Sequence, residues 1–212
     1  NGSTIYPQLM YRLQYLRTGS GPERLVVAHS VETGTNTSGL RWYELRNNGV
    51  GWSIEQQNTF SPGGSSSAFM GSAAANVLDQ VGLGFNISTG ASPVSVNYTG
   101  QDPGDPTGTY LGTGSLGAGG DATPNGVWGS LGSISLDPID GCAFWFTGQR
   151  PLVNSIWGTR VGSFTVDDPT ACPADTFARV TADATWSGTL IREGLTLTGV
   201  AGTFAGATTT SY

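Results

Sequence analysis

The hexapeptide RWYELR contains the most chemically versatile set of side chains in the chain. Arg41 and Arg46 could hold a carboxylate through paired hydrogen bonds. Tyr43 beside Glu44 could serve as an activated nucleophile in glycoside cleavage. In an extended strand, however, successive side chains point to opposite faces, so these two residues cannot form a close pair. We therefore expect a framework strand with Trp42 packed between sheets, and no catalytic residue in this segment.

A second polar segment, SLDPIDGCAFWFTG from Ser135, sets two carboxylates beside a proline and a glycine. A calcium loop needs six or more oxygen ligands and a D-x-D-x-D-G spacing, which this segment lacks. Pro138 presets φ for a turn and Gly141 can adopt a positive φ. Asp137 and Asp140 can accept hydrogen bonds from turn amides. We interpret the segment as a tight turn between two strands and not as a metal site.

The remaining motifs give no support to other kinds of chemistry. One histidine and two separated cysteines are too few for a zinc site. His29 ends the run LVVAH, where a hydrogen-bonded structural histidine is expected. The chain has no G-x-S-x-G nucleophile elbow and no glycine spacing of a nucleotide-binding loop. We therefore expect neither a metal nor a cofactor.

Three apolar runs recur about every 60 residues, and they define the elements that position these segments. RLVVAHSV starts at Arg24, VGLGFNIS at Val81 and CAFWFTG at Cys142. Each run is followed, after a polar gap, by a second strand-like segment. These segments are GLRWYELR, PVSVNYTG and WGTRVGSFTV. The second and third runs are preceded by MGSAAANVLDQ and LGSISLDPIDG, which end in acidic turns. The repeat unit is therefore strand, acidic turn, strand, variable loop, strand.

This repeat predicts an all-β fold, with YRLQYLR, WSIEQQNTF and TGTYLGTGS as candidates for a fourth strand. Repeats of this length with three or four strands suit a large β-propeller blade. A sandwich built of hairpins is the competing architecture. We expect three blades of a partial propeller in residues 1–172. Residues 173–212 alternate Thr, Gly and apolar residues, and predict a β-rich C-terminal extension of two or three strands.

The composition is typical of an acidic, secreted strand-and-turn protein. The 212 residues include 33 glycines and only 11% charged residues, and the net charge is −6. All nine basic residues are arginines, and this charge balance disfavours nucleic acid as a partner. No apolar run is long enough to span a membrane. The start at Asn1, without Met, leads us to expect a processed or truncated product. In such a chain we favour a disulfide between Cys142 and Cys172 over free thiols.

Five motifs follow one another between Tyr11 and Cys172: YRLQY, LVVAHSV, GLRWYELR, NYTGQDPGDPTGT and DP-x-D-x-C-x-FW. Together they resemble a family of secreted bacterial proteins with a sialidase-like, BNR-type β-propeller. The resemblance implies a propeller fold and an extracellular location, and it supports the disulfide because such proteins carry a second cysteine after the last repeat. It implies little about activity. A complete propeller has four to eight blades, whereas three repeats are visible here.

These observations predict a non-enzymatic extracellular structural or interaction module that assembles with another chain. That chain would be a second copy, the remainder of a precursor or a member of a larger extracellular assembly. A fragment of a sialidase-like glycoside hydrolase is one alternative. A carbohydrate-binding propeller is another, because sugars stack on exposed aromatic side chains. The weak candidates for ligand binding are Arg41, Tyr43, Arg46, Trp128, Trp145 and Trp157.

Overall fold

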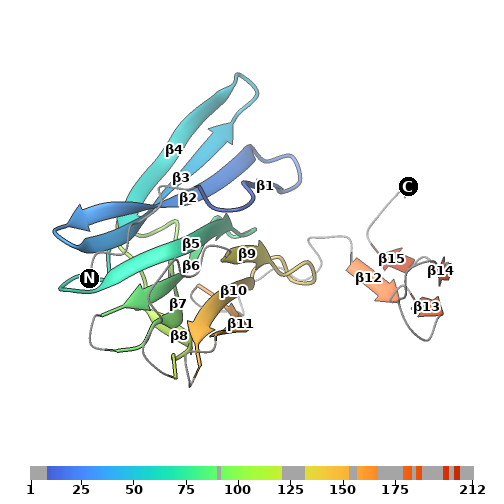
Figure 1. The fold of residues 1–212 in the computed structure, drawn as a ribbon. Coiled ribbons are helices and arrows are strands. Elements are labelled where there is room, and N and C mark those ends of the chain that lie inside the picture. Colours follow the sequence, from blue (N-terminus) through green and yellow to red (C-terminus); the bar gives the residue numbers. More distant parts are fainter. Residues whose placement is uncertain are drawn as a thin grey trace.

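The computed structural model describes residues 9–89, 92–120, 132–152 and 157–166, and the backbone of four short strands nearer the C-terminus (Figure 1). The described residues form antiparallel sheets and no helix, which confirms the all-β prediction. None of their elements is a helix of the length and apolar character needed to cross a membrane.

Three sheets make up the body of the structure, and each contains the strands of one sequence repeat. Sheet A consists of β1 (Gln14–Arg17), β2 (Glu23–Gly34), β3 (Thr37–Asn47) and β4 (Trp52–Phe60). Sheet B consists of β5 (Ser67–Ala75), β6 (Val81–Ser88), β7 (Ser95–Gln101) and β8 (Gly114–Gly117). Sheet C consists of β9 (Ser133–Leu136), β10 (Phe144–Pro151) and β11 (Trp157–Phe164). Each sheet is an antiparallel meander in which neighbours in sequence are neighbours in the sheet.

The predicted strand segments correspond to the observed strands, with one shift. RLVVAHSV lies in β2, VGLGFNIS forms β6, and CAFWFTG overlaps β10. TGTYLGTGS was expected to be a strand, but it contributes only its last residues, since β8 starts at Gly114. The residues before β8 pack against sheet A and do not form a strand. Tyr110 lies edge-on to Phe60, and its hydroxyl accepts a hydrogen bond from the buried Trp42 indole.

Sheet B is the middle layer, and its strand β6 is buried on both faces (Figure 1). Val81, Leu83 and Phe85 belong to the apolar cluster shared with sheet A. Gly82 and Gly84 alternate with them and face the opposite way. A Cβ added at either glycine would fall on an aromatic ring, that of Phe144 or of Phe146 in sheet C. Small residues on one face of β6 therefore make room for the large residues of the next sheet.

The free edge of β5 is covered by polar side chains from sheet A. The amide of Gln14 forms two hydrogen bonds with the backbone of Ala75, at 2.9 and 2.6 Å. The Ser38 hydroxyl donates to the carbonyl of Ala68 at 2.8 Å. An uncovered strand edge invites pairing with other chains, so these side chains both satisfy the backbone and protect the edge.

The C-terminal extension forms two further strand pairs. β12 (Arg179–Ala182) pairs with β15 (Thr203–Ala205), and β13 (Thr185–Ser187) pairs with β14 (Thr198–Val200). The part of residues 173–212 that the structure describes consists of these four short strands, where two or three were expected. The predicted domain boundary at residues 172/173 lies outside the described residues and stays a prediction.

We predict that Gly84→Ala destabilises the fold, because the added methyl group would occupy the position of the Phe146 ring. Overpacking of this kind costs about 1–3 kcal/mol in a rigid interior. Gly112→Ala is the matched control, since no heavy atom lies within 4 Å of its Cβ position. Urea unfolding of the three proteins measures the difference. Equal midpoints for Gly84→Ala and Gly112→Ala would contradict the close approach of β6 and β10.

Candidate functional site

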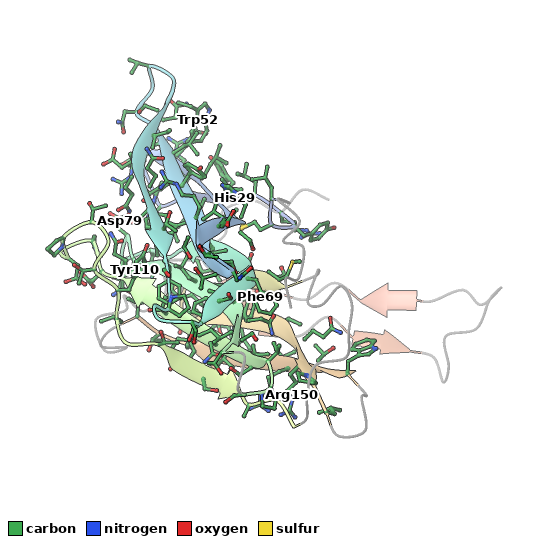
Figure 2. The ribbon with its side chains drawn as sticks, turned by 60° about the vertical axis from the view of Figure 1, so that its left-hand side comes forward. His29, Trp52, Phe69, Asp79, Tyr110 and Arg150 are labelled. Carbon is green, nitrogen blue, oxygen red and sulfur yellow. The ribbon has the colours of Figure 1, made fainter. Side chains whose placement is uncertain are left out.

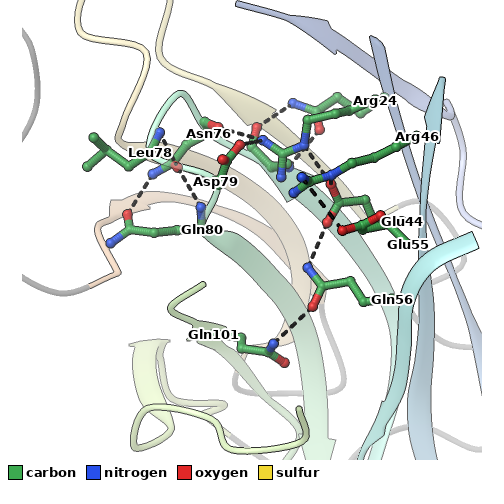
Figure 3. Close-up of polar contacts among 12 residues, drawn as sticks. Arg24, Glu44, Arg46, Glu55, Gln56, Asn76, Leu78, Asp79, Gln80 and Gln101 are labelled. Carbon is green, nitrogen blue, oxygen red and sulfur yellow. Dashed lines mark hydrogen bonds and ion pairs between the residues drawn. The ribbon is translucent and has the colours of Figure 1, made fainter. Parts of the chain in front are cut away.

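An ion cluster of Arg24, Glu44, Arg46 and Asp79 joins sheet A to the turn that follows β5 (Figure 3). Its centre is buried, whereas the Asp79 side chain is 53% exposed. Arg24 on β2 and Glu44 on β3 occupy inward positions and are 2% and 0% exposed. Arg24 Nε donates to Glu44 Oε1 at 2.6 Å, and its Nη1 donates to Asp79 Oδ1 at 2.7 Å. The same nitrogen donates to the carbonyl of Asn76 at 3.1 Å.

Both carboxylate oxygens of Glu44 are occupied by donors. Arg46 Nε donates to Oε1 at 2.8 Å, and Gln56 Nε2 donates to Oε2 at 2.6 Å. Burial alone would raise the pKa of Glu44, but the hydrogen bond and charge of Arg24, with the donors from Gln56 and Arg46, hold it below its ordinary value. A carboxylate held ionised and fully bonded in this way serves as an anchor and is a poor general acid.

Asn76 extends this connection to the third sheet. Its side-chain oxygen accepts hydrogen bonds from the backbone amides of Leu78 and Gln80, each at 3.0 Å. Its Nδ2 donates to the carbonyl of Cys142, in the turn between β9 and β10 of sheet C, at 3.2 Å. Asp79, in the same turn, has a φ of 64°. The turn thus contacts sheet A through Arg24 and sheet C through Asn76, which identifies the cluster as a structural connection.

The outer face of sheet A carries a second group, made of His29, Arg41 and Tyr43. The His29 and Tyr43 rings are stacked with centroids 5.8 Å apart, and Arg41 lies 5.3 Å from the Tyr43 centroid. Arg41 also donates to Gln57 Oε1 at 2.6 Å and to Thr59 Oγ1 at 3.2 Å. Figure 2 shows His29 on this sheet. The group lies on the opposite face from Glu44, as strand alternation predicted.

The Asp137–Gly141 segment is the predicted tight turn. The Asp137 carboxylate accepts a hydrogen bond from the amide of Ile139 at 2.8 Å, and Gly141 has a φ of 65°. The Asp140 carboxylate accepts from the amides of Cys142 and Ala143, at 2.8 and 3.0 Å. Both carboxylates therefore hold backbone amides, in the role that the sequence pattern indicated.

The structure separates the six candidate ligand-binding residues into different places. Arg41 and Tyr43 are together on the outer face of sheet A, whereas Arg46 belongs to the ion cluster on the other face. Trp145 and Trp157 are on sheet C, 41% and 60% exposed. Trp128 lies outside the described residues.

Sequence reasoning missed Arg24 and Asp79. For Arg24 an indication was present, because positions 24, 26, 28 and 30 all fall on the buried face of β2. A charged residue at such a position needs a buried partner of opposite charge. The identity of that partner, Glu44, depends on the antiparallel pairing of β2 with β3, in which Arg24 lies opposite Arg46.

Comparison with known proteins finds no matching family model, no similar curated protein and no similar solved structure. Function must therefore be argued from the geometry of this chain.

We predict that Glu44→Gln lowers the free energy of unfolding by about 1.5–3 kcal/mol, because Arg24 loses its buried carboxylate and keeps only the half-exposed Asp79 as a charged partner. Glu55→Gln is the matched control. Its side chain is 45% exposed and its oxygen is 3.8 Å from Arg46, so a change within about 0.5 kcal/mol is expected. Denaturant unfolding at pH 7 measures both values. Similar losses for the two variants would contradict the structural role of the buried cluster.

The same residue predicts a sensitivity to acid. The pKa of Glu44 is lowered from 4.5, so the folded state binds its proton less readily than the unfolded state does. The stabilisation is complete above pH 4.5 and is lost as the pH falls through the folded-state pKa. Unfolding free energies of the wild type should decrease over this acid range, and those of Glu44→Gln should decrease less. Parallel pH profiles would show that Glu44 does not carry the effect.

Proposed function

We propose that this chain is a non-enzymatic extracellular interaction module that associates with another polypeptide through the outer face of sheet A. The observation that carries the proposal is the apolar character of that face. Leu25 and Leu45 lie directly opposite each other on β2 and β3, and Val27 lies opposite Tyr43. These residues alternate with the buried positions and are only partly covered. Apolar residues thus occur on this face as well as on the buried inner side of the sheet.

Neighbouring strands extend this apolar surface. Tyr15 on β1 pairs with Leu25 and is 53% exposed, and Ile54 on β4 pairs with Leu45 and is 54% exposed. A contiguous apolar face of this kind on a soluble protein marks an interaction site. Single exposed apolar residues would not indicate an interaction site, but the strand register places these residues together on one surface.

We take a second copy of the chain as the partner. The outer face of sheet A carries both signs of charge, since Arg17 lies opposite Glu23. A two-fold interface places the same patch on both copies, so a patch with both signs can satisfy itself. If the partner were instead the remainder of a precursor or another extracellular chain, it would bind the same apolar surface.

We further propose that the three sheets are blades of a partial β-propeller of the BNR type. Support comes from three successive meanders and from the packing of sheet C on sheet B, in which β10 lies against β6 and β7. The step from sheet A to sheet B differs, because β5 contacts both β2 and β3. The resemblance noted in the sequence is consistent with this arrangement.

The glycoside hydrolase alternative receives no support from the described contacts. Sialidases differ from most glycoside hydrolases in using a tyrosine nucleophile, which here would have to pair with a nearby glutamate. Glu44 is sealed by its three donors, and the contacts of Tyr43 are with His29 and Arg41. We therefore propose binding without catalysis.

An extracellular location predicts that Cys142 and Cys172 form a disulfide. Cys142 is 4% exposed in the turn just before β10, and Cys172 lies outside the described residues. A bond between them would stabilise the fold by roughly 3–4 kcal/mol in the chain-entropy model. Mass spectrometry of the native protein without reductant should find a linked pair of peptides. Two thiols that react with an alkylating agent after unfolding would contradict the assignment.

Sedimentation of the purified chain tests the proposed association. We expect a reversible dimer at micromolar concentration, and expect Leu45→Lys to weaken it at least about tenfold because it places a charge in the apolar interface. Val161→Lys is the control, since Val161 is 54% exposed on sheet C. A wild-type chain that stays monomeric over the whole concentration range would overturn the proposal. Equal weakening by the two lysine variants would place the interface elsewhere.

A further inference from the structure

The outer face of sheet C has a different chemistry from that of sheet A. Register places four directly opposed pairs on this face of β10 and β11: Trp145 with Ser163, Thr147 with Val161, Gln149 with Thr159, and Pro151 with Trp157. Residues that lie opposite each other in a sheet project from the same face. The two tryptophans therefore project on the same side, at opposite ends of the strand pair.

The spacing of the two tryptophans matches the length of an elongated ligand. The partner of Trp157 is Pro151, six positions along β10 from Trp145. At a rise of 3.3 Å per residue the two indoles are ~20 Å apart along the strand direction. A ligand that contacts both must be an extended chain of several units.

The first of these tryptophans is held in place. Trp145 Nε1 donates to Asp137 Oδ2 at 2.8 Å, and the Asp137 backbone is fixed in the turn by a 2.9 Å hydrogen bond from Gly141 N. The indole remains 41% exposed. A ring whose orientation is already fixed loses less conformational entropy on binding.

Between the tryptophans the surface is polar and uncharged. Thr147, Gln149 and Thr159 offer hydroxyl and amide groups, and Ser163, opposite Trp145, adds another hydroxyl. The aliphatic side chains of the four pairs are Val161 and the buried Pro151. None of the eight paired residues is ionisable, although the chain as a whole has a net charge of −6. This combination suits a neutral, polyhydroxylated ligand, whose hydroxyls can exchange hydrogen bonds with such groups.

We propose that the outer face of sheet C binds a neutral polysaccharide chain that runs along β10 and β11. Sugar rings stack on Trp145 and Trp157, and the hydroxyls between them bond to Thr147, Gln149 and Thr159. Aromatic side chains suit this contact because they combine a broad apolar face with a polar edge. The site is separate from the association surface, since sheet B lies between sheets A and C (Figures 1 and 2).

A protein partner is the less favoured occupant of this face. A protein interface has an apolar core at its centre and a polar rim. Here the order is reversed, because the large aromatic residues are at the ends and the hydroxyl and amide groups are in the middle.

Calorimetric titration with four neutral hexasaccharides, those of the cello-, xylo-, manno- and N-acetylated chito- series, tests the proposal. We expect at least one of them to bind, and expect Trp145→Ala and Trp157→Ala each to weaken binding about tenfold or more, the usual effect of losing an aromatic anchor. Trp52→Ala is the matched control, because Trp52 is a 44% exposed tryptophan on β4, far from sheet C. Polygalacturonate is the acidic control ligand, and we expect it to bind more weakly than the neutral sugars.

The results separate this proposal from the proposed association. Leu45→Lys should dissociate the dimer and still bind the hexasaccharide with unchanged affinity. Absence of binding by all four sugars at millimolar concentration would overturn the glycan site and leave the association untouched. Tighter binding of polygalacturonate, or equal losses in Trp52→Ala and Trp157→Ala, would also overturn it. Thermal unfolding of each variant verifies that the fold is retained.

Discussion

The structure depends on the burial of sheet B between two other sheets. Its strand β6 presents Val81, Leu83 and Phe85 to sheet A and glycines to sheet C. The rings of Phe144 and Phe146 fill the space above those glycines, so the backbones of β6 and β10 approach closely. A side chain on the glycine face would separate the layers. Close packing therefore fixes the order of the sheets and leaves the outer faces of sheets A and C outside this core.

The ion cluster fixes how sheet A lies on sheet B. Apolar layers can slide over one another, but Arg24 must reach Glu44 on the neighbouring strand and Asp79 in the turn of the next sheet at once. A buried charge that loses its partner is costly, so the pairing penalises any other arrangement. The cluster thus has a structural role. Arg41 and Tyr43 lie on the opposite face of sheet A from Glu44 and Arg46, as strand alternation predicted.

Much of the fold follows from local patterns in the sequence, whereas the contacts between sheets do not. The apolar runs and the turn at Asp137 were predictable, because alternation and turn chemistry involve neighbouring residues. The link between Arg24 and Asp79 joins residues 55 positions apart, and no local sequence pattern predicts it. Trp145 could be named as a candidate from sequence, but its relation to Trp157 on the same face required the register of β10 and β11.

Hydrogen exchange measured at two protein concentrations tests most directly the claim that a three-layer core presents sheet A for association. The account predicts that the amides of β6 exchange most slowly at both concentrations, since they lie in the middle strand of the middle layer. Raising the concentration should slow exchange in sheet A, at β3 and β4, and leave β11 unchanged. Fast exchange in β6, or a concentration-dependent slowing confined to β11, would contradict the account.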